Sequence, residues 1–399
     1  MAIPDISALG KLLSTHEALW RPIPFYGVPE WTARHPQLLQ WIRALSEERL
    51  AYYEQNPDAL LDVTELQPFL PLAEIQSLIT LPVSAELSLH PEVWGAHING
   101  RKWLQIQYFA SSVMPYAQTA DLLVEWCAGK GHLGRLMSRL TDKPVRSVEW
   151  DAALCKQGEL LAQKQSLNVQ FTCADVLKPF QSPWCDARVP HVMALHACGD
   201  LHTELISKAV TEQLSVSMAP CCYHRIQAET YQPLSRQGKE TIRANALSLD
   251  RESLRLAVQE TVTAPGQVRA QREHLAIWRL AADLCRQALT GDDAYKPSPS
   301  LSYGQLPEHF KDYLRQQAKW HGFTVPDGVD DELWLQQARE RFLHIRQEEL
   351  VRHLFRRPLE IFLIADRALV LSEAGMKVDI EVFCPRELSP RNVLITAVR

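Results

Sequence analysis

Short apolar runs alternate with helix-spaced apolar residues through the middle of the chain. The runs predict β-strands at residues 122–124, 145–150, 169–176, 191–197 and 214–221. Helical spacing predicts the intervening helices at 133–140, 152–164 and 201–210, with a further helix over 94–120 before the first strand. Such alternation is typical of a parallel sheet with helices packed on its faces.

The pattern changes after the fifth strand and resumes near the C-terminus. Residues 228–357 are mostly helical by periodicity, and a helix over 359–374 then leads into strands at 377–383 and 392–398. Two strands joined by so short a loop must be antiparallel, because a parallel pair needs a longer crossover. We therefore predict an α/β fold with a seven-stranded, Rossmann-like sheet that ends in an antiparallel β-hairpin.

The chain of 399 residues is longer than a typical single domain, so we expect additions to one nucleotide-binding core. Residues 1–93 are predicted to form an N-terminal helical accessory domain, and residues 94–227 the first part of the core. Residues 228–357 are predicted to be a helical insertion on the substrate side. Residues 358–399 would complete the core with its last helix and the hairpin.

Composition excludes several classes of protein. Hydrophobic residues make up 46% and charged residues 22%, as in ordinary globular proteins, and a net charge of -5 gives no global attraction to nucleic acid. The nine cysteines include no C-x-x-C pair, no leader is evident, and apolar runs are too short to span a bilayer. We expect a cytoplasmic protein without a membrane partner, and the oligomeric state stays open.

A glycine-rich turn follows the first predicted strand. Gly129, Gly131 and Gly134 have the spacing G-x-G-x-x-G, and a helix begins near His132. This pattern predicts a nucleotide site in which the first free N–H groups of the helix face the ligand. The motif alone does not choose the nucleotide, since Glu149 lies 20 residues past Gly129, as an NAD-binding site would require.

Two features favour another nucleotide. Glu125 lies where the dinucleotide fold normally carries an apolar residue, and an anion there suits a ligand with an ammonium group. The terminal hairpin also differs from the parallel Rossmann sheet. Both features resemble the class I S-adenosylmethionine-dependent methyltransferases, over residues 99–227 and 358–399.

One branch of that class is more similar still. The segments that carry the resemblance are GRKWLQI (100–106), CAGKGHLG (127–134), LHACGDL (195–201), APCCYHR (219–225), IADRALVL (364–371) and SPRN (389–392). They resemble the methyltransferase-domain family of methyltransferase-like proteins. That family includes the glutathione S-transferase C-terminal-domain-containing protein and is similar to a tRNA ribose 2′-O-methyltransferase. Residues 1–90 and 228–355 are covered least.

The resemblance implies S-adenosylmethionine as the cofactor. It implies that Glu125 faces the amino group of the cofactor, Glu149 binds the ribose hydroxyls and Asp175 binds the adenine amine. Lys102 would reach the carboxylate, although a solvated charge is an equal alternative. The full set of predicted cofactor-binding residues is Lys102, Glu125, Cys127, Gly129, Gly131, His132, Leu133, Glu149, Trp150, Asp175, Val176 and His196.

Candidate catalytic residues follow the fourth and fifth strands, where the methyl acceptor should meet the cofactor. They are His196, Asp200, Tyr223 and His224. His196 or Asp200 would take a proton from the acceptor, or His196 would only pack beside the cofactor. The predicted substrate-binding residues are Cys198, Cys222, Arg391 and Asn392, with a rigid turn as the alternative for the last two. The acceptor atom stays open, because the motif typical of amino-methylating enzymes is absent.

Soft ligand groups also gather at this edge. Cys221, Cys222 and His224 with His196 and Cys198 invite a zinc site, because thiolate and imidazole are preferred zinc ligands. Adjacent cysteines do not easily point at one metal, and C-x-x-C pairs are absent. We therefore predict no metal, with Cys221 a buried strand residue.

Arginines are frequent at 339–357, with Phe342 and Phe355 between them. Such a face is typical of RNA tracking, but glutamates at 340, 348 and 349 favour a solvated amphipathic helix. Because the helical additions are large for an enzyme of small molecules, we predict methyl transfer to a macromolecule, RNA or protein. The alternatives are a small-metabolite methyltransferase and a non-catalytic scaffold that binds S-adenosylmethionine.

Overall fold

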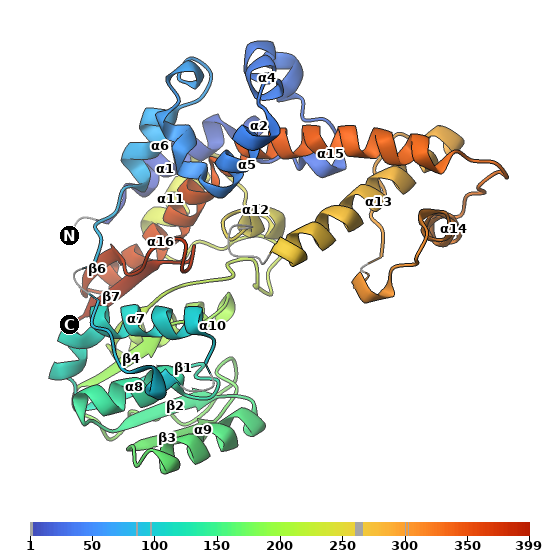
Figure 1. Ribbon diagram of the computed structural model, residues 1–399. Helices are drawn as coiled ribbons and strands as arrows, with labels where there is room; N and C mark the ends of the chain where they lie inside the picture. The colour runs from blue at the N-terminus through green and yellow to red at the C-terminus, as the bar shows by residue number, and fades with distance from the viewer. Residues whose placement is uncertain (1–2, 85–86, 96–97, 260–265, 300, 302) are drawn as a thin grey trace. The chain divides into compact units, whose positions relative to one another are not determined.

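The computed structural model describes residues 3–84, 87–95, 98–259, 266–299, 301 and 303–399 (Figure 1). The chain divides into two compact units. The first unit comprises Met1–Thr15, Ile75–Glu260 and Arg356–Arg399, and the second comprises His16–Glu74 and Thr261–Phe355. Each unit therefore contains segments that are far apart in the sequence.

A seven-stranded sheet forms the centre of the first unit, in the order β3-β2-β1-β4-β5-β7-β6. Its strands are β1 (Leu122–Trp126), β2 (Val145–Glu149), β3 (Val169–Cys173), β4 (Pro190–Ala194), β5 (Ser215–Met218), β6 (Lys377–Val382) and β7 (Val393–Val398). Strands β1 to β5 are parallel, while β7 runs antiparallel between β5 and β6. The predicted fold class and the terminal hairpin are confirmed.

The first unit also contains eight described helices. Those helices are α1 (Ile6–Thr15), α7 (Gly100–Thr119), α8 (His132–Thr141), α9 (Ala152–Lys164), α10 (Asp200–Glu212), α11 (Arg236–Ala244), α12 (Arg251–Leu256) and α16 (Arg356–Glu373), with the short turn η4 (Glu92–Gly95). Of these, α8, α9, α10 and α16 contact strands of the sheet, while α1, α11 and α12 pack on α16. The helix α6 (Leu72–Ile79) crosses the boundary between the units in the chain. Buried side chains of α7 and α8, including Phe109 and Met137, form one apolar core with Leu123 of β1. This packing fixes the face of β1 that also carries Glu125.

Element boundaries differ from the predictions by a few residues. Helix α7 begins at Gly100 instead of residue 94, because the Asn99 side chain accepts a hydrogen bond from the Arg101 N–H and so caps the helix. Strand β3 ends at Cys173 instead of residue 176. The chain turns there, where the Lys178 N–H donates to the Asp175 carbonyl, and this turn places Asp175 in a loop.

The second unit is helical. It contains α2 (Glu17–Trp20), η1 (Pro24–Tyr26), α3 (Trp31–Arg34), α4 (Pro36–Arg43), α5 (Glu47–Gln55), η2 (Pro57–Asp62), η3 (Thr64–Leu66), α13 (Gly266–Thr290), η5 (Tyr303–Gln305), α14 (Phe310–His321) and α15 (Asp331–His353). Trp278, Phe310 and Tyr313 lie in its apolar core. The fully buried Glu348 carboxylate pairs with Arg43 and Arg341, which joins α4 to α15.

The four predicted segments do not coincide with these units. The N-terminal helix α1 packs on α11 and α16 in the first unit, and α11 and α12 also pack on α16. The second unit combines most of the predicted N-terminal domain with most of the predicted insertion, because α15 packs against α2, α4 and α5. The predicted domain boundaries remain a prediction.

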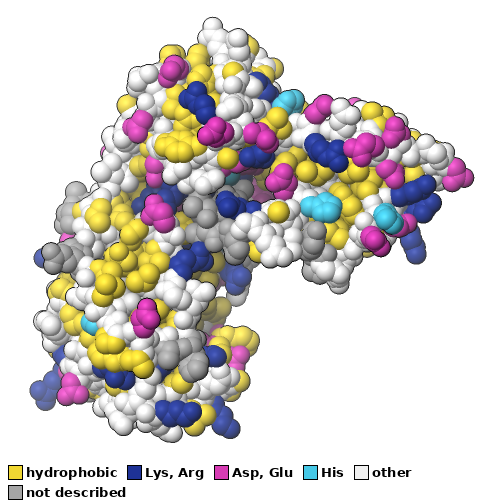
Figure 2. Space-filling model, viewed as in Figure 1, with side chains coloured by type: hydrophobic (Ala, Val, Ile, Leu, Met, Phe, Trp, Pro, Cys, Tyr) yellow, Lys and Arg dark blue, Asp and Glu magenta, His cyan; other side chains and the backbone are white. Residues whose placement is uncertain are grey.

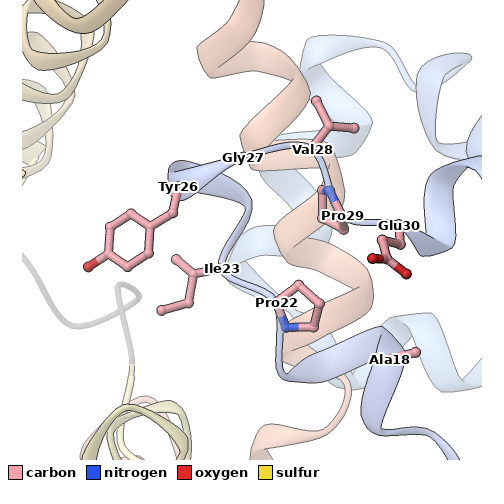
Figure 3. A pocket seen from close by; sticks show the side chains of 8 residues that line it. All are labelled: Ala18, Pro22, Ile23, Tyr26, Gly27, Val28, Pro29 and Glu30. Carbon is pink, nitrogen blue, oxygen red and sulfur yellow. The ribbon is translucent and has the colours of Figure 1, made fainter. Parts of the chain in front are cut away.

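A pocket of about 370 Å³ lies in the second unit (Figure 3). Its walls come from a single stretch of chain and consist of Ala18, Pro22, Ile23, Tyr26, Gly27, Val28, Pro29 and Glu30. None of these residues belongs to the predicted site. Within the part of the chain that the structure describes, no helix is long and apolar enough to cross a bilayer.

Candidate active site

The glycine turn after β1 is held by the carboxylate at the end of β2. Cys127, Gly129 and Gly131 all have left-handed backbone angles, with φ between 56° and 67°. The Gly129 N–H donates to Glu149 Oε2 over 2.8 Å, while Glu149 Oε1 accepts from two backbone N–H groups at the start of the next loop. Glu149 thus shapes the turn; ribose binding by this residue stays a prediction.

Glu125 of β1 is buried, with 6% of its surface exposed. Its Oε2 atom accepts hydrogen bonds from the Gly134 N–H at 3.0 Å and from the Ser147 hydroxyl at 3.1 Å. A side chain at Gly134 would place its Cβ 2.6 Å from the same oxygen, so the third glycine of the motif makes room for this carboxylate. Burial raises the pKa of Glu125 to about 7, against hydrogen bonds that favour ionisation.

The other predicted cofactor contacts lie around the same edge of the sheet. Asp175, in the loop after β3, forms an ion pair with Lys178 at 3.1 Å and accepts a hydrogen bond from the Leu177 N–H. Both interactions lower the pKa of the Asp175 carboxyl. Trp150 is 74% exposed at the end of β2. Leu133 and Val176 are buried. Their contacts with a cofactor stay predictions.

The His132 side chain is surrounded by basic groups, among them Lys102. The Nδ1 atom of His132 accepts from the Arg135 guanidinium at 2.6 Å. Burial, then the charges of Arg135 and Lys102, lower the pKa of His132 to about 3. His132 is therefore neutral near pH 7, while the exposed Lys102 supplies a cation to this edge.

His196 follows β4 and contacts α7. Gln105 Oε1 accepts from His196 Nε2 at 3.2 Å, which leaves the lone pair of the neutral ring on Nδ1. The residue keeps some exposure to solvent. Its pKa is nevertheless lowered to about 4, first by desolvation of the ring and then by the charges of Lys102 and Arg391. His196 can therefore accept a proton at neutral pH, although only as a weak base.

The loops that follow β4 and β5 are joined by their backbones. The Gly199 N–H donates to the Cys221 carbonyl, and the Asp200 N–H donates to the Arg225 carbonyl at 3.1 Å. The Asp200 carboxylate accepts from the Gln227 N–H at 2.8 Å. Asp200 thus braces the second loop, and its predicted role as a base stays a prediction.

Replacing Gly199 by alanine is expected to destabilise the protein by roughly 3 kcal/mol or more. A Cβ there would lie 1.8 Å from the Arg225 carbonyl oxygen, and φ is +55°. Thermal unfolding by calorimetry measures the effect. Gly304→Ala is the matched control, because its Cβ meets nothing within 4 Å. Equal melting temperatures for the two variants would show that the loops are not held together in this way.

Three thiols meet between these loops. The Sγ atoms of Cys198, Cys221 and Cys222 all lie within 4.8 Å of one another, and those of Cys198 and Cys221 are 3.2 Å apart. Hydrogen bonds from the other two thiols, then the charges of Arg391 and Arg225, lower the pKa of Cys222. Cys221 is buried, as predicted, but just beyond the end of β5.

Tyr223 and His224 follow these cysteines. Tyr223 is 1% exposed, and its ring packs edge-on against His202 and over the Arg367 guanidinium. Burial raises the pKa of its hydroxyl well above the usual value. The structure thus places Tyr223 below the surface, and its predicted catalytic role stays a prediction. His224 is half-buried, and burial lowers its pKa.

The hairpin loop between β6 and β7 lies at the same edge as the thiols. Because β7 is antiparallel to β5, its first residues follow the end of β5 in space. The charge of Arg391 lowers the pKa of both His196 and Cys222, so the guanidinium lies near them. Asn392 is buried, donates to the Cys384 carbonyl and accepts from Arg357. These contacts are the ones expected if Asn392 stabilises a rigid turn and does not bind the substrate.

The arginines of residues 339–357 bond to other groups of the protein. Arg339 pairs with Glu332, Arg341 with Glu348, Arg346 with Glu54, Arg352 with Glu349 and Arg357 with Glu360, while Arg356 donates to the Gln259 carbonyl. On the face shown in Figure 2, Lys and Arg side chains lie among Asp and Glu side chains. These arginines are engaged within the protein, which argues against a basic track, but Glu348, Arg352 and Arg356 are buried, so the segment is not a fully solvated helix either.

Sequence reasoning missed several residues of this region. Gln105 contacts His196 from a position 91 residues away, and Ser147 donates to Glu125 from the neighbouring strand. Only the Gly199 position carried a usable signal, since a glycine between a cysteine and an aspartate after a strand indicates a close backbone approach.

Comparison with known families decides the class of the core. Residues 101–229 match the family described as "Methyltransferase domain". This segment is a methyltransferase domain. The match covers α7, the glycine turn, β1 to β5 and both cysteine-bearing loops, which are the elements that build the candidate site.

Curated relatives match a part of the chain of similar length. The glutathione S-transferase C-terminal domain-containing protein of Xenopus laevis is 27% identical over 129 residues, which are 32% of this chain and 20% of that protein. The homologue from Drosophila pseudoobscura pseudoobscura is 26% identical over 148 residues, or 36% and 24%. The chain thus spans at most a quarter of the length of these relatives.

Solved structures are only distantly similar. The plantazolicin methyltransferase BpumL in complex with SAH is 13% identical, with 70% of this chain and 95% of that chain covered and a TM-score of 0.23. The assignment of the methyltransferase domain therefore rests on the family match and on the sheet topology.

Proposed function

We propose that this protein is an S-adenosylmethionine-dependent methyltransferase that acts on RNA. The observation that carries the proposal is the buried Glu125 carboxylate beside the glycine turn of a methyltransferase domain. A carboxyl group whose pKa is raised to about 7 by burial gains from a nearby cation. The ammonium group of S-adenosylmethionine is such a cation, whereas a nicotinamide dinucleotide has no ammonium group to place there.

The remaining residues would orient the cofactor and the acceptor. The bound cofactor would supply a methyl group on a positively charged sulfur. Glu149 and Asp175 would hold the ribose and the adenine, as the family resemblance implies. His196 would accept a proton from the acceptor at Nδ1, because the ring is neutral near pH 7 and Gln105 orients it through Nε2.

The acceptor side of the proposal rests on charge and on the resemblance. Arg391 places a cation near His196, and a guanidinium binds phosphate well. The family resemblance includes a tRNA ribose methyltransferase, and a second, helical unit is large for an enzyme of small metabolites. The arginines of α15 are engaged by carboxylates, so we assign the phosphate contact to Arg391 instead.

Transfer of a radiolabelled methyl group tests this function. The protein is incubated with labelled S-adenosylmethionine and extract from cells that lack it, and RNA, protein and small molecules are then separated. We expect label in RNA with the wild type and background label with Glu125→Gln. Label only in small molecules or only in protein would reject RNA. If NADH and not S-adenosylmethionine raised the melting temperature, the cofactor assignment would be wrong.

A further inference from the structure

We infer that Cys198, Cys221 and Cys222 form a metal site for a soft divalent ion of the zinc class. This inference does not depend on the proposed methyl transfer. The ligand atoms come from two loops, one after β4 and one after β5, and all three sulfurs lie within 4.8 Å of one another. Thiolate sulfur is a preferred ligand of zinc.

The spacing of the sulfurs is close to that of a tetrahedral ion. Zinc–sulfur bonds of about 2.3 Å at tetrahedral angles place the sulfurs roughly 3.8 Å apart. The Sγ atoms of Cys198 and Cys221 are 3.2 Å apart, and all three sulfurs lie within 4.8 Å of one another. Side-chain rotations that move the sulfurs by up to about 1 Å would therefore complete the arrangement.

The backbone explains how neighbouring cysteines reach one point. In a strand, successive side chains point to opposite faces, which is why adjacent cysteines argue against a shared metal. Strand β5 ends at Met218, and Cys222 has a left-handed backbone with φ of 45°. The chain thus turns at Cys222, and both sulfurs lie on the same side as Cys198. The sequence-based objection to a metal does not apply to this turn.

The two loops are also fixed before any ion binds. Cys198 and Cys221 form an isolated parallel β-bridge, and Gly199 allows the Arg225 carbonyl to approach closely. A site held in this way loses little conformational entropy when it binds an ion. Among the described residues, the group contains no fourth His, Cys, Asp or Glu ligand. Water or another donor would therefore take the fourth position of the ion, as in zinc sites with three protein ligands.

Zinc titration of the reduced full chain tests the site. The protein is purified without a histidine tag, treated with a chelator and a phosphine reductant, and titrated with Zn²⁺ by calorimetry. We expect one ion per chain, with release of thiol protons to the buffer. Co²⁺ should give the near-ultraviolet charge-transfer absorption of thiolate ligands.

Single substitutions assign the ligands. Cys222→Ser and Cys198→Ser are expected to lower zinc affinity by at least about 100-fold, since even the loss of an outer-shell partner costs 10- to 100-fold. Cys185→Ser, at an exposed cysteine outside the cluster, should bind as the wild type does. Melting temperatures measured without metal show whether each variant folds.

Three results would overturn the site. The first is a reduced wild type, with all nine thiols free, that binds no zinc. The second is zinc binding that is unchanged in both Cys198→Ser and Cys222→Ser. The third is a protein that takes no zinc but forms a Cys198–Cys221 disulfide in air, which would identify a redox pair instead.

Discussion

Replacing Glu125 by glutamine is expected to weaken S-adenosylmethionine binding by roughly a hundredfold, or about 3 kcal/mol. The substitution keeps the shape of the side chain and an oxygen that can accept from the Gly134 N–H and the Ser147 hydroxyl. It removes the buried negative charge that would face the cofactor ammonium. Calorimetric titration of both proteins at pH 7.5 measures the difference.

Two comparisons make this experiment specific. Glu159→Gln, at an exposed position of α9, should bind as the wild type does. 5′-Methylthioadenosine carries the adenine and ribose but no ammonium group, so Glu125→Gln should bind it as well as the wild type does. Equal loss of affinity for both ligands would mean that Glu125 only supports the glycine turn.

The pH dependence of binding and of stability should run in opposite directions. Because the pKa of Glu125 is raised from 4.5 to about 7 in the fold, the protonated carboxyl is favoured there. Its contribution to stability is complete below about pH 4.5 and is lost as the pH rises through about 7, by about 3 kcal/mol in all. Binding of a cationic ligand needs the ionised form and should strengthen between pH 5.5 and 7.

Glutamine at position 125 removes both dependences. The variant should melt at a higher temperature than the ligand-free wild type at pH 8, and its residual affinity should not rise between pH 5.5 and 7. Wild-type affinity that stays constant over this interval would contradict the assignment of the ammonium group to Glu125.

Local patterns in the sequence predicted the sheet well because they depend on neighbouring residues. Apolar runs gave the strands of the methyltransferase core, and a short loop forced the last two strands to be antiparallel. Glu125 stood out for a similar reason, since a charge inside an apolar strand is costly unless it serves a ligand.

Contacts between distant segments could not be predicted in this way. The hydrogen bond between Gln105 and His196 depends on how distant segments meet after the sheet has formed, and so does the choice of the Arg225 carbonyl as the group that approaches Gly199. The pattern placed the thiols at one edge of the sheet, but it does not predict that Cys221 and Cys222 point the same way. Their direction depends on the turn beyond β5, where Cys222 has a left-handed backbone.

Contacts between distant segments also explain why the predicted segment 228–357 is divided between the two units. Its first part, up to Glu260, belongs to the first unit. Asp366 of α16 is fully buried and accepts hydrogen bonds from that segment. Its donors are the Tyr231 hydroxyl at 2.5 Å, the Leu234 N–H at 2.7 Å, and the N–H and hydroxyl of Ser235 at 3.0 and 2.5 Å. A single carboxylate therefore fastens the start of the segment to α16.

Asp366→Ala is expected to destabilise the first unit by about 5 kcal/mol, because hydrogen bonds to a buried charge contribute about 1.5 to 3 kcal/mol each and are only partly additive. Calorimetry should show a lower melting temperature for one transition, and hydrogen exchange should show faster exchange over residues 231–244.

Asp366→Asn should lose less stability, because its carbonyl oxygen still accepts from some of the donors. Asp327→Ala, at an exposed position, is the control. Slow exchange at Leu234 and Ser235 in the alanine variant would mean that packing on α16, and not Asp366, holds this segment in place.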